Sequence, residues 1–266
     1  MKAAQRVSSF FSAFRRFSRP RPEPVGAADA AAPLRIGLAL GGGFARGIAH
    51  AGVLAVLDRH RIPIHCITGV SAASNVAAAY ASGAPPAEIA RAGCAMRFSQ
   101  VARWSFPRMG FVANKRMETF LGHLLKCYRF EEMPIPLGVL ATDLCTGEPV
   151  RFRDAGDVFL PIRASCSYPG LFQPVSCNGK LLVDGATSME IPALLARQLG
   201  ATHVISVRLP AQAANRPPAN VFQVVNRCFQ MMQCRNEREW RQASDLVIEP
   251  EVEAVEWDGF ASGPNY

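Results

Sequence analysis

The chain has 266 residues, of which 49% are apolar and 19% are charged, and its formal net charge is +8. This length fits one large α/β domain, and the apolar fraction excludes a wholly disordered or collagen-like chain. No run of about 18 strongly apolar residues predicts a membrane-spanning helix. Composition therefore predicts a soluble globular domain, of a kind that suits an enzyme.

The excess positive charge is concentrated at the amino terminus. Residues 1–22 hold six basic residues and no acidic one, whereas the rest of the chain holds 23 basic and 21 acidic residues. The body therefore lacks the basic surplus of a nucleic-acid-binding protein, and we expect no nucleic-acid partner. Apolar residues of the tail recur at helical spacing opposite the arginines, namely Val7, Phe10, Phe11, Phe14 and Phe17.

That tail is open to three interpretations. An amphipathic basic helix could lie on an anionic membrane surface, the same composition suits an organellar transit peptide, and a disordered extension fits equally well. We therefore assign residues 1–33 to a tail and linker, with peripheral membrane contact as one option.

From residue 34 onward, strand and helix patterns alternate. Strands are predicted at 34–40, 64–68, 137–143, 149–152, 181–184, 203–209 and 245–249. Helices are predicted at 45–60, 72–82, 115–126, 189–199 and 219–241. This alternation predicts an α/β fold with a mainly parallel central sheet and helices on both faces. The predicted domain spans 34–250, followed by a tail at 251–266.

Residues 94–130 interrupt this alternation with an apolar but aperiodic segment that includes Trp104, Phe106, Met109 and Phe111. Two interpretations stay open. The segment could cap an active site, as lids and loops do in many enzymes, or it could pack as an ordinary excursion of the core.

The eight cysteines include no Cys-x-x-Cys pair and no Cys/His cluster with metal-binding spacing. The amino terminus shows no secretory pattern. We therefore expect reduced thiols, a cytoplasmic location and no metal or other cofactor.

A glycine-rich loop, Gly41-Gly42-Gly43-Phe44-Ala45-Arg46-Gly47, follows the first strand and opens a helix. Such a loop presents backbone N–H groups to negative charge. It lacks the Gly-Lys-Ser/Thr of a nucleotide-triphosphate loop, and arginine occupies a glycine position of the dinucleotide fingerprint. An oxyanion hole for acyl transfer remains, and that function requires a nucleophile.

Ser71 is the candidate nucleophile. It lies between a predicted strand and helix in Gly69-Val70-Ser71-Ala72-Ala73, which is the context of a nucleophile elbow. Small residues at 69 and 73 would let the strand and helix cross, although Ala73 replaces the glycine of the usual Gly-x-Ser-x-Gly.

Asp184 is the best candidate for the base. It ends an apolar strand before Gly185-Ala186, and burial there would raise its pKa enough to accept a serine proton. Asp143 also ends a strand, but we expect it to cap a turn. His50 is interpreted as structural, and His203, which begins an apolar strand, leaves a Ser-His-Asp site as a less favoured alternative.

Five blocks in fixed order resemble the patatin-like phospholipase family, in its bacterial branch related to neuropathy target esterase, over residues 34–250. They are LRIGLALGGGFARGIAHAGVLAVLDRHRIPIHCITGVSAAS, ATDLCTGEPVRFRD, IRASCSYPGLFQPV, LLVDGA and DLVIEP. The resemblance implies a three-layer αβα sandwich. It also implies Ser71 as nucleophile, Asp184 of the Asp-Gly-Ala motif as proton acceptor, and backbone amides around Gly42 and Gly43 as oxyanion donors. Arg46 fills the family's basic loop position.

The implied activity is hydrolysis of lipid esters, phospholipids or lysophospholipids, through an acyl-enzyme. An alternative from another class is a catalytically impaired lipid-binding or regulatory protein on the same fold. It arises because Ala73 and Phe44 stand where the family usually has smaller residues.

Overall fold

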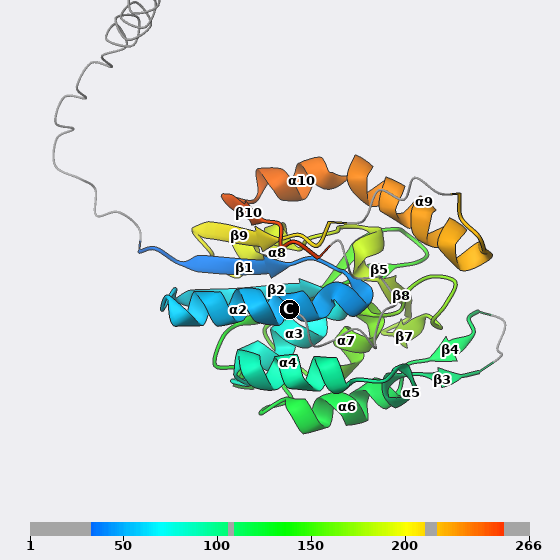
Figure 1. Cartoon of the computed structure of the whole chain (residues 1–266), viewed down its shortest axis with the longest axis horizontal. Helices are drawn as coiled ribbons and strands as arrows, with labels where there is room; N and C mark the ends of the chain where they lie inside the picture. Colours follow the sequence, from blue (N-terminus) through cyan, green and yellow to red (C-terminus); the bar gives the residue numbers. More distant parts are fainter. Residues whose placement is uncertain (1–32, 106–108, 211–216, 253–266) are drawn as a thin grey trace, which may run out of the picture. The chain divides into compact units, whose positions relative to one another are not determined.

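A computed structural model describes residues 33–105, 109–210 and 217–252 (Figure 1). The strands are β1 (Ile36–Leu40), β2 (Ile64–Val70), β3 (Arg103–Trp104), β4 (Val112–Ala113), β5 (Leu137–Asp143), β6 (Pro149–Phe152), β7 (Val175–Cys177), β8 (Lys180–Asp184), β9 (His203–Val207) and β10 (Leu246–Ile248). The helices are η1 (Phe44–Ile48), α2 (Ala49–Arg59), α3 (Ala72–Ala81), α4 (Pro86–Ala95), α5 (Phe98–Val101), α6 (Arg116–Leu124), η2 (Phe130–Glu132), α7 (Phe159–Ser165), η3 (Gly185–Thr187), α8 (Ala193–Gln198), α9 (Val221–Arg235) and α10 (Glu237–Gln242).

The main sheet of the described residues has eight strands in the order β10-β9-β1-β2-β5-β8-β7, with β6 also paired to β5. Strands β10, β9, β1, β2 and β5 are mutually parallel. Strands β6 and β8 run antiparallel to β5, and β7 runs antiparallel to β8. Leu40 pairs with Gly69 of β2 and Val207 of β9, so these parallel strands end at one edge of the sheet. The predicted mainly parallel sheet is confirmed.

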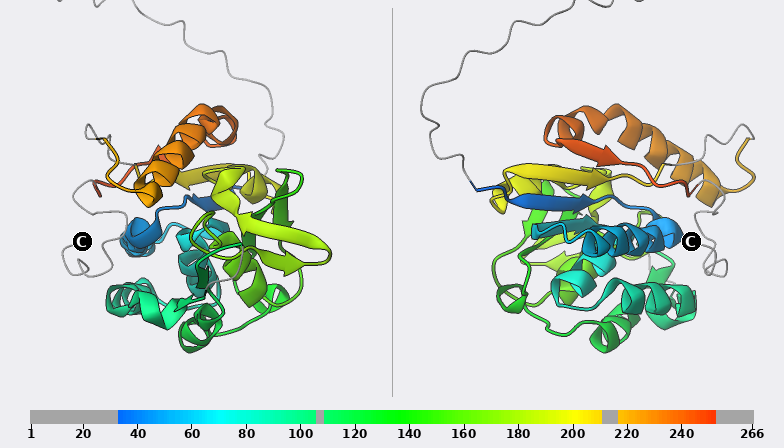
Figure 2. Two further views of the ribbon diagram at one scale, coloured as in Figure 1. Left: turned by 90° about the vertical axis from the view of Figure 1, so that its right-hand side faces the viewer. Right: turned by 60° about the vertical axis from the view of Figure 1, so that its left-hand side comes forward.

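Helices cover both faces of this sheet. Leu38 and Leu40 of β1 face a core that includes α3, whereas Ala39 between them faces a second core that includes α8 and α10. This alternation is expected of a strand buried on both sides. Helices α9 and α10 lie beside β9 and β10, on the side away from α4 and α6 (Figures 1 and 2). The predicted α/β sandwich is therefore confirmed.

Several boundaries differ from the sequence prediction. The helix expected at 219–241 is two helices, because Asn236 leaves helical geometry between α9 and α10. The helix expected at 45–60 begins as the 3₁₀ turn η1. Helices α4 and α7, strand β7 and the hairpin β3–β4 were not predicted.

The aperiodic segment at 94–130 contributes to the main core through Val112, Met117 and Leu121, which are buried. Its residues Trp104, Met109 and Phe111 are exposed. The proposed amphipathic helix of the tail lies outside the described residues. No helix among the described residues is long and apolar enough to cross a membrane, and all eight cysteine thiols are free.

Two tryptophans provide a matched test of this packing. Trp240 is 0% exposed in the core beneath α10, whereas Trp104 is 60% exposed. We expect Trp240→Ala to lower the free energy of unfolding by about 3–5 kcal/mol, because it leaves a large cavity. Trp104→Ala should cost less than about 1 kcal/mol. Urea unfolding followed by circular dichroism measures both, and equal losses would contradict the packing described.

Candidate active site

Ser71 lies at the sharp junction between β2 and α3, with φ 55° and ψ −135°. This left-handed backbone conformation costs a non-glycine residue on the order of 1–3 kcal/mol, so the surroundings must hold it. The Ser71 amide donates to Ser165 Oγ at 2.8 Å, and the Ser71 carbonyl accepts from Ser74 Oγ at 2.6 Å and Cys166 Sγ at 3.1 Å. Three hydrogen bonds therefore fix the strained turn.

The elbow also depends on Gly69. A Cβ atom at this position would lie 2.7 Å from the Ala73 carbonyl oxygen and 2.8 Å from Ser74 Cα, both in the backbone of α3. Such distances exclude any side chain, which explains why residue 69 is small. Ala73 is fully buried, and its methyl group is accommodated while the turn keeps its geometry.

Asp184 faces this serine from the end of β8. Its Oδ2 accepts a hydrogen bond from Ser71 Oγ at 2.6 Å, and its Oδ1 accepts from the Ala186 amide at 2.9 Å. The carboxyl is 1% exposed. Burial raises the pKa of Asp184 from 3.8 to about 7, against the opposing effect of the two hydrogen bonds. The group is therefore poised to exchange a proton with Ser71 near neutral pH.

The register of β5 brings the two residues together. Val70 of β2 pairs with Leu140, and the next residue of β5, Ala141, pairs with Asp184. Strand β5 thus continues past the end of β2, and β8 pairs antiparallel with this additional part of β5. As a result, Asp184, the last residue of β8, lies beside Ser71, the residue that follows β2. The sequence interpretation placed Asp184 at the edge where parallel strands end. That reason is wrong, because β8 is antiparallel.

The glycine loop passes over the serine. The Gly41 amide donates to Val207 O at 2.9 Å, and the Gly42 amide donates to Glu190 O at 3.4 Å. A Cβ atom on Gly42 would lie 3.3 Å from Ser71 Cβ, which is tighter than usual. Within the described residues the Gly43 amide has no hydrogen-bond acceptor. Of these three amides, that of Gly43 is therefore the best available donor to a ligand in the pocket. The Gly42 amide makes only a long hydrogen bond, and the Gly41 amide is already paired within the sheet.

Arg46 lies in η1 with 7% of its surface exposed. Its Nη1 donates to Pro210 O at 2.5 Å, and its Nε has no hydrogen-bond partner in the described part of the chain. Burial lowers the pKa of the guanidinium. Arg46 therefore ties η1 to the segment after β9 and also lines the pocket described next.

A pocket of about 70 Å³ opens beside Ser71 and Asp184. Gly42, Gly43, Phe44 and Arg46 form one side, and helix α9 supplies much of another. The α9 residues that line it are Asn226, Phe229, Gln230, Gln233 and Cys234. No described residue of 94–130 lines this pocket, so the interpretation of that segment as a cap is not supported.

Tyr168 joins α9 to the glycine loop. Its hydroxyl bonds to Asn226 Oδ1 at 3.2 Å, and its ring lies 5.1 Å from that of Phe229 and 6.3 Å from that of Phe44. The sequence predicts a helix over 219–241 but gives it no role at the site. It also gives no role to Ser165 and Cys166, although both lie in the IRASCSYPGLFQPV block of the family resemblance.

His50 has a structural role, as predicted. It is fully buried, and its Nε2 bonds to Gly41 O at 2.8 Å. Burial lowers the pKa of its imidazole to about 4, so the ring is neutral near pH 7. Asp143 likewise stabilises a turn, because its Oδ1 accepts from the Cys145 amide at 3.0 Å.

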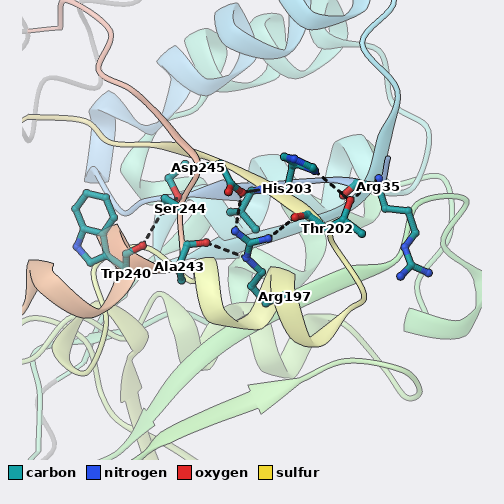
Figure 3. A network of polar contacts seen from close by, with 10 residues as sticks. Arg35, Arg197, Thr202, His203, Trp240, Ala243, Ser244 and Asp245 are labelled. Atoms are coloured by element: carbon teal, nitrogen blue, oxygen red, sulfur yellow. Dashed lines mark hydrogen bonds and ion pairs between the residues drawn. The ribbon is translucent and has the colours of Figure 1, made fainter. Parts of the chain in front are cut away.

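His203 begins β9 at the edge opposite Ser71, paired with Ile36 at the start of β1. Its Nδ1 bonds to Thr202 Oγ1 at 3.2 Å, beside the ion pair between Arg197 and Asp245 (Figure 3). Among the described residues no histidine lines the pocket. The Ser-His-Asp alternative is therefore wrong. Nor do any three His, Cys, Asp or Glu residues in the described ranges form a metal site.

The raised pKa of Asp184 predicts a pH-dependent stability. The folded protein binds this proton more tightly than the unfolded chain, so the contribution of Asp184 to the unfolding free energy falls between about pH 4 and about pH 7. Asp184→Asn cannot ionise. Its stability relative to the unsubstituted chain should rise by on the order of 3 kcal/mol over that range.

Urea unfolding of both proteins at about pH 4.5 and about pH 7.5 measures this difference. Other titrating groups contribute equally to the two proteins and cancel. A stability difference that is the same at both pH values would contradict a raised pKa at Asp184.

Comparison with known proteins places this geometry in a family. The family model of patatin-like phospholipases matches residues 38–197, which include both Ser71 and Asp184. The solved structure of VipD from Legionella pneumophila superposes with a TM-score of 0.52 at 16% identity, over 75% of this chain and 53% of that one. At this level of identity, the likeness concerns the fold alone.

Curated relatives are similar in sequence. Lysophospholipase NTE1 of Debaryomyces hansenii is 30% identical over 193 residues, which cover 70% of this chain and 12% of that protein. An uncharacterized NTE family protein of Mycobacterium tuberculosis is 31% identical over 198 residues, which cover 73% of this chain and 54% of that protein. The chain therefore spans about half of the length of the Mycobacterium tuberculosis relative and about an eighth of that of the Debaryomyces hansenii relative. It belongs to the patatin-like phospholipase family.

Proposed function

We propose that the chain hydrolyses lipid esters, with Ser71 as nucleophile and Asp184 as its general base. The observation that carries this proposal is the 2.6 Å hydrogen bond from Ser71 Oγ to a buried carboxylate. Burial raises the pKa of that carboxyl to about 7, where a carboxylate is basic enough to take a serine proton.

The reaction has two steps. In the first, Ser71 Oγ attacks the ester carbonyl carbon while its proton passes to Asp184, and the developing oxyanion accepts a hydrogen bond from the Gly43 amide. The intermediate collapses, Asp184 protonates the leaving alcohol, and an acyl-serine remains. In the second step Asp184 takes a proton from water, the hydroxide attacks the acyl carbonyl, and the released Ser71 oxygen regains its proton.

The proposed substrates are lysophospholipids or phospholipids. Two relatives with this domain carry the name lysophospholipase, although the chain covers only 12% of each. Aromatic rings of Phe44, Tyr168 and Phe229 line the pocket, which favours an acyl chain near the serine.

A second candidate, an impaired lipid-binding protein, is favoured by one feature. Phe44 adopts a left-handed φ of 52° in the glycine loop and lines the pocket, which narrows it beside the serine. In that case the pocket would bind lipid without turnover. Measured turnover separates the two candidates.

Hydrolysis assays with lysophosphatidylcholine and p-nitrophenyl butyrate test the proposal. We expect Ser71→Ala and Asp184→Asn each to lower kcat/KM by at least about 10³-fold, because each removes a group that acts in the transition state. The matched controls Ser176→Ala and Asp154→Asn alter exposed residues of the same types and should retain full activity. Folded unsubstituted protein that hydrolyses neither ester would favour the impaired candidate.

A further inference from the structure

Helix α9 exposes an apolar stripe beside the pocket. The residues through which it lines the pocket are of mixed polarity, namely Asn226, Phe229, Gln230, Gln233 and Cys234. The face toward solvent is apolar, and its members are Val221 (66% exposed), Val224 (44%), Met231 (51%) and Met232 (50%), with Cys228 also exposed. Surface helices of soluble domains normally turn such a stripe inward. A contiguous exposed apolar face beside a pocket marks an interaction surface.

The hairpin β3–β4 adds a second apolar projection. Trp104 is 60% exposed, and Met109 and Phe111 are 61% and 48% exposed. The Phe111 amide donates to Leu171 O at 3.0 Å, and the same segment reaches α9 through the hydrogen bond from Tyr168 to Asn226. Both elements lie at the end of the sheet toward which β1 points (Figure 1). Both elements therefore present apolar side chains at the same end of the sheet.

Positive charge accompanies both elements. The sequence from 217 to 236, which contains α9, has two arginines and no acidic residue. The described residues of 97–117, which include the hairpin strands, have three arginines, one lysine and no acidic residue. Apolar side chains next to cationic ones complement an anionic lipid surface.

We propose that the outer face of α9 (Val221, Val224, Cys228, Met231 and Met232), together with the hairpin β3–β4, docks on an anionic phospholipid surface. This proposal deepens the proposed function, since it supposes that the substrate is a lipid. Unbranched methionines adapt to an irregular apolar medium, and the arginines lie near phosphate groups. Docking on α9 places the wall of the pocket at the lipid surface, so an acyl chain could pass between α9 and the glycine loop.

The test compares two variants of the 266-residue chain. Each adds two substitutions to a parent that carries Ser71→Ala, so that no lipid is consumed. Met231→Glu with Met232→Glu changes the α9 face and spares every residue that lines the pocket. The matched control, Leu34→Glu with Val56→Glu, makes the same charge change at exposed apolar residues, one just before β1 and one in α2. Co-sedimentation with vesicles of phosphatidylcholine, with or without about 30% phosphatidylglycerol, measures binding.

We expect the parent chain and the control to bind the anionic vesicles more tightly than the neutral ones. The α9 variant should lose at least about tenfold in affinity for the anionic vesicles, because two carboxylates would enter the interface. Its melting temperature, measured by circular dichroism, should match that of the control. The amino-terminal tail is the same in all three proteins, so a difference between them reports on α9.

Equal vesicle binding by the α9 variant and the control would overturn the proposal, as would failure of the parent chain to bind. A parent dimer that the α9 variant converts to a monomer, without vesicle binding, would assign this face to contact between two copies. The same α9 substitutions made with Ser71 intact should leave p-nitrophenyl butyrate hydrolysis unchanged. Because binding is measured without turnover, absence of hydrolysis in the unsubstituted chain would refute the proposed activity and leave the docking result to stand.

Discussion

A carboxyl group held out of water against a serine hydroxyl is the contact on which the rest of the site depends. Water around Asp184 would return the pKa of its carboxyl toward 3.8, and the group would lose most of its basicity. The sheet keeps water out because β5 extends past β2 and pairs with β8, so Asp184 ends level with Ser71 inside the packed layers. Pairing register therefore controls the chemistry of the pair as well as its geometry.

On the serine side of this contact, a strained backbone conformation at Ser71 is stabilised by hydrogen bonds to its amide and carbonyl groups. The left-handed backbone of Ser71 is held by a hydrogen bond from its amide to Ser165 Oγ and by two bonds that its carbonyl accepts, from Ser74 Oγ and Cys166 Sγ. Burial raises the pKa of the Cys166 thiol to about 12, so this sulfur stays protonated and remains a donor. A rigid elbow of this kind fixes the position of the serine hydroxyl, whereas α9 lines another side of the pocket and exposes an apolar stripe.

Local sequence predicted the parts of this site that depend on a few neighbouring residues. The strand, the Gly69-x-Ser71 turn and the following helix form one contiguous signal. Both residues of the proposed dyad, Ser71 and Asp184, were predicted from local signals of this kind. The antiparallel direction of β8 was missed, because direction depends on pairing between segments about 40 residues apart. The position of α9 beside the pocket was missed for a related reason: helical periodicity predicts a helix but does not show which distant segments it packs against. Ser165 gave no signal of its own, since its role depends on a contact 94 residues away.

The most direct test of the Ser71–Asp184 assignment is the rate at which a fluorophosphonate probe modifies the purified chain, followed by mass spectrometry across pH. We predict one adduct, on Ser71, that forms faster as pH rises through about 7, where Asp184 loses its proton. In Asp184→Asn the rate should be lower by at least about 10³-fold and should lose that step. Modification of another residue, or a rate that does not respond to loss of the Asp184 carboxylate, would contradict the assignment.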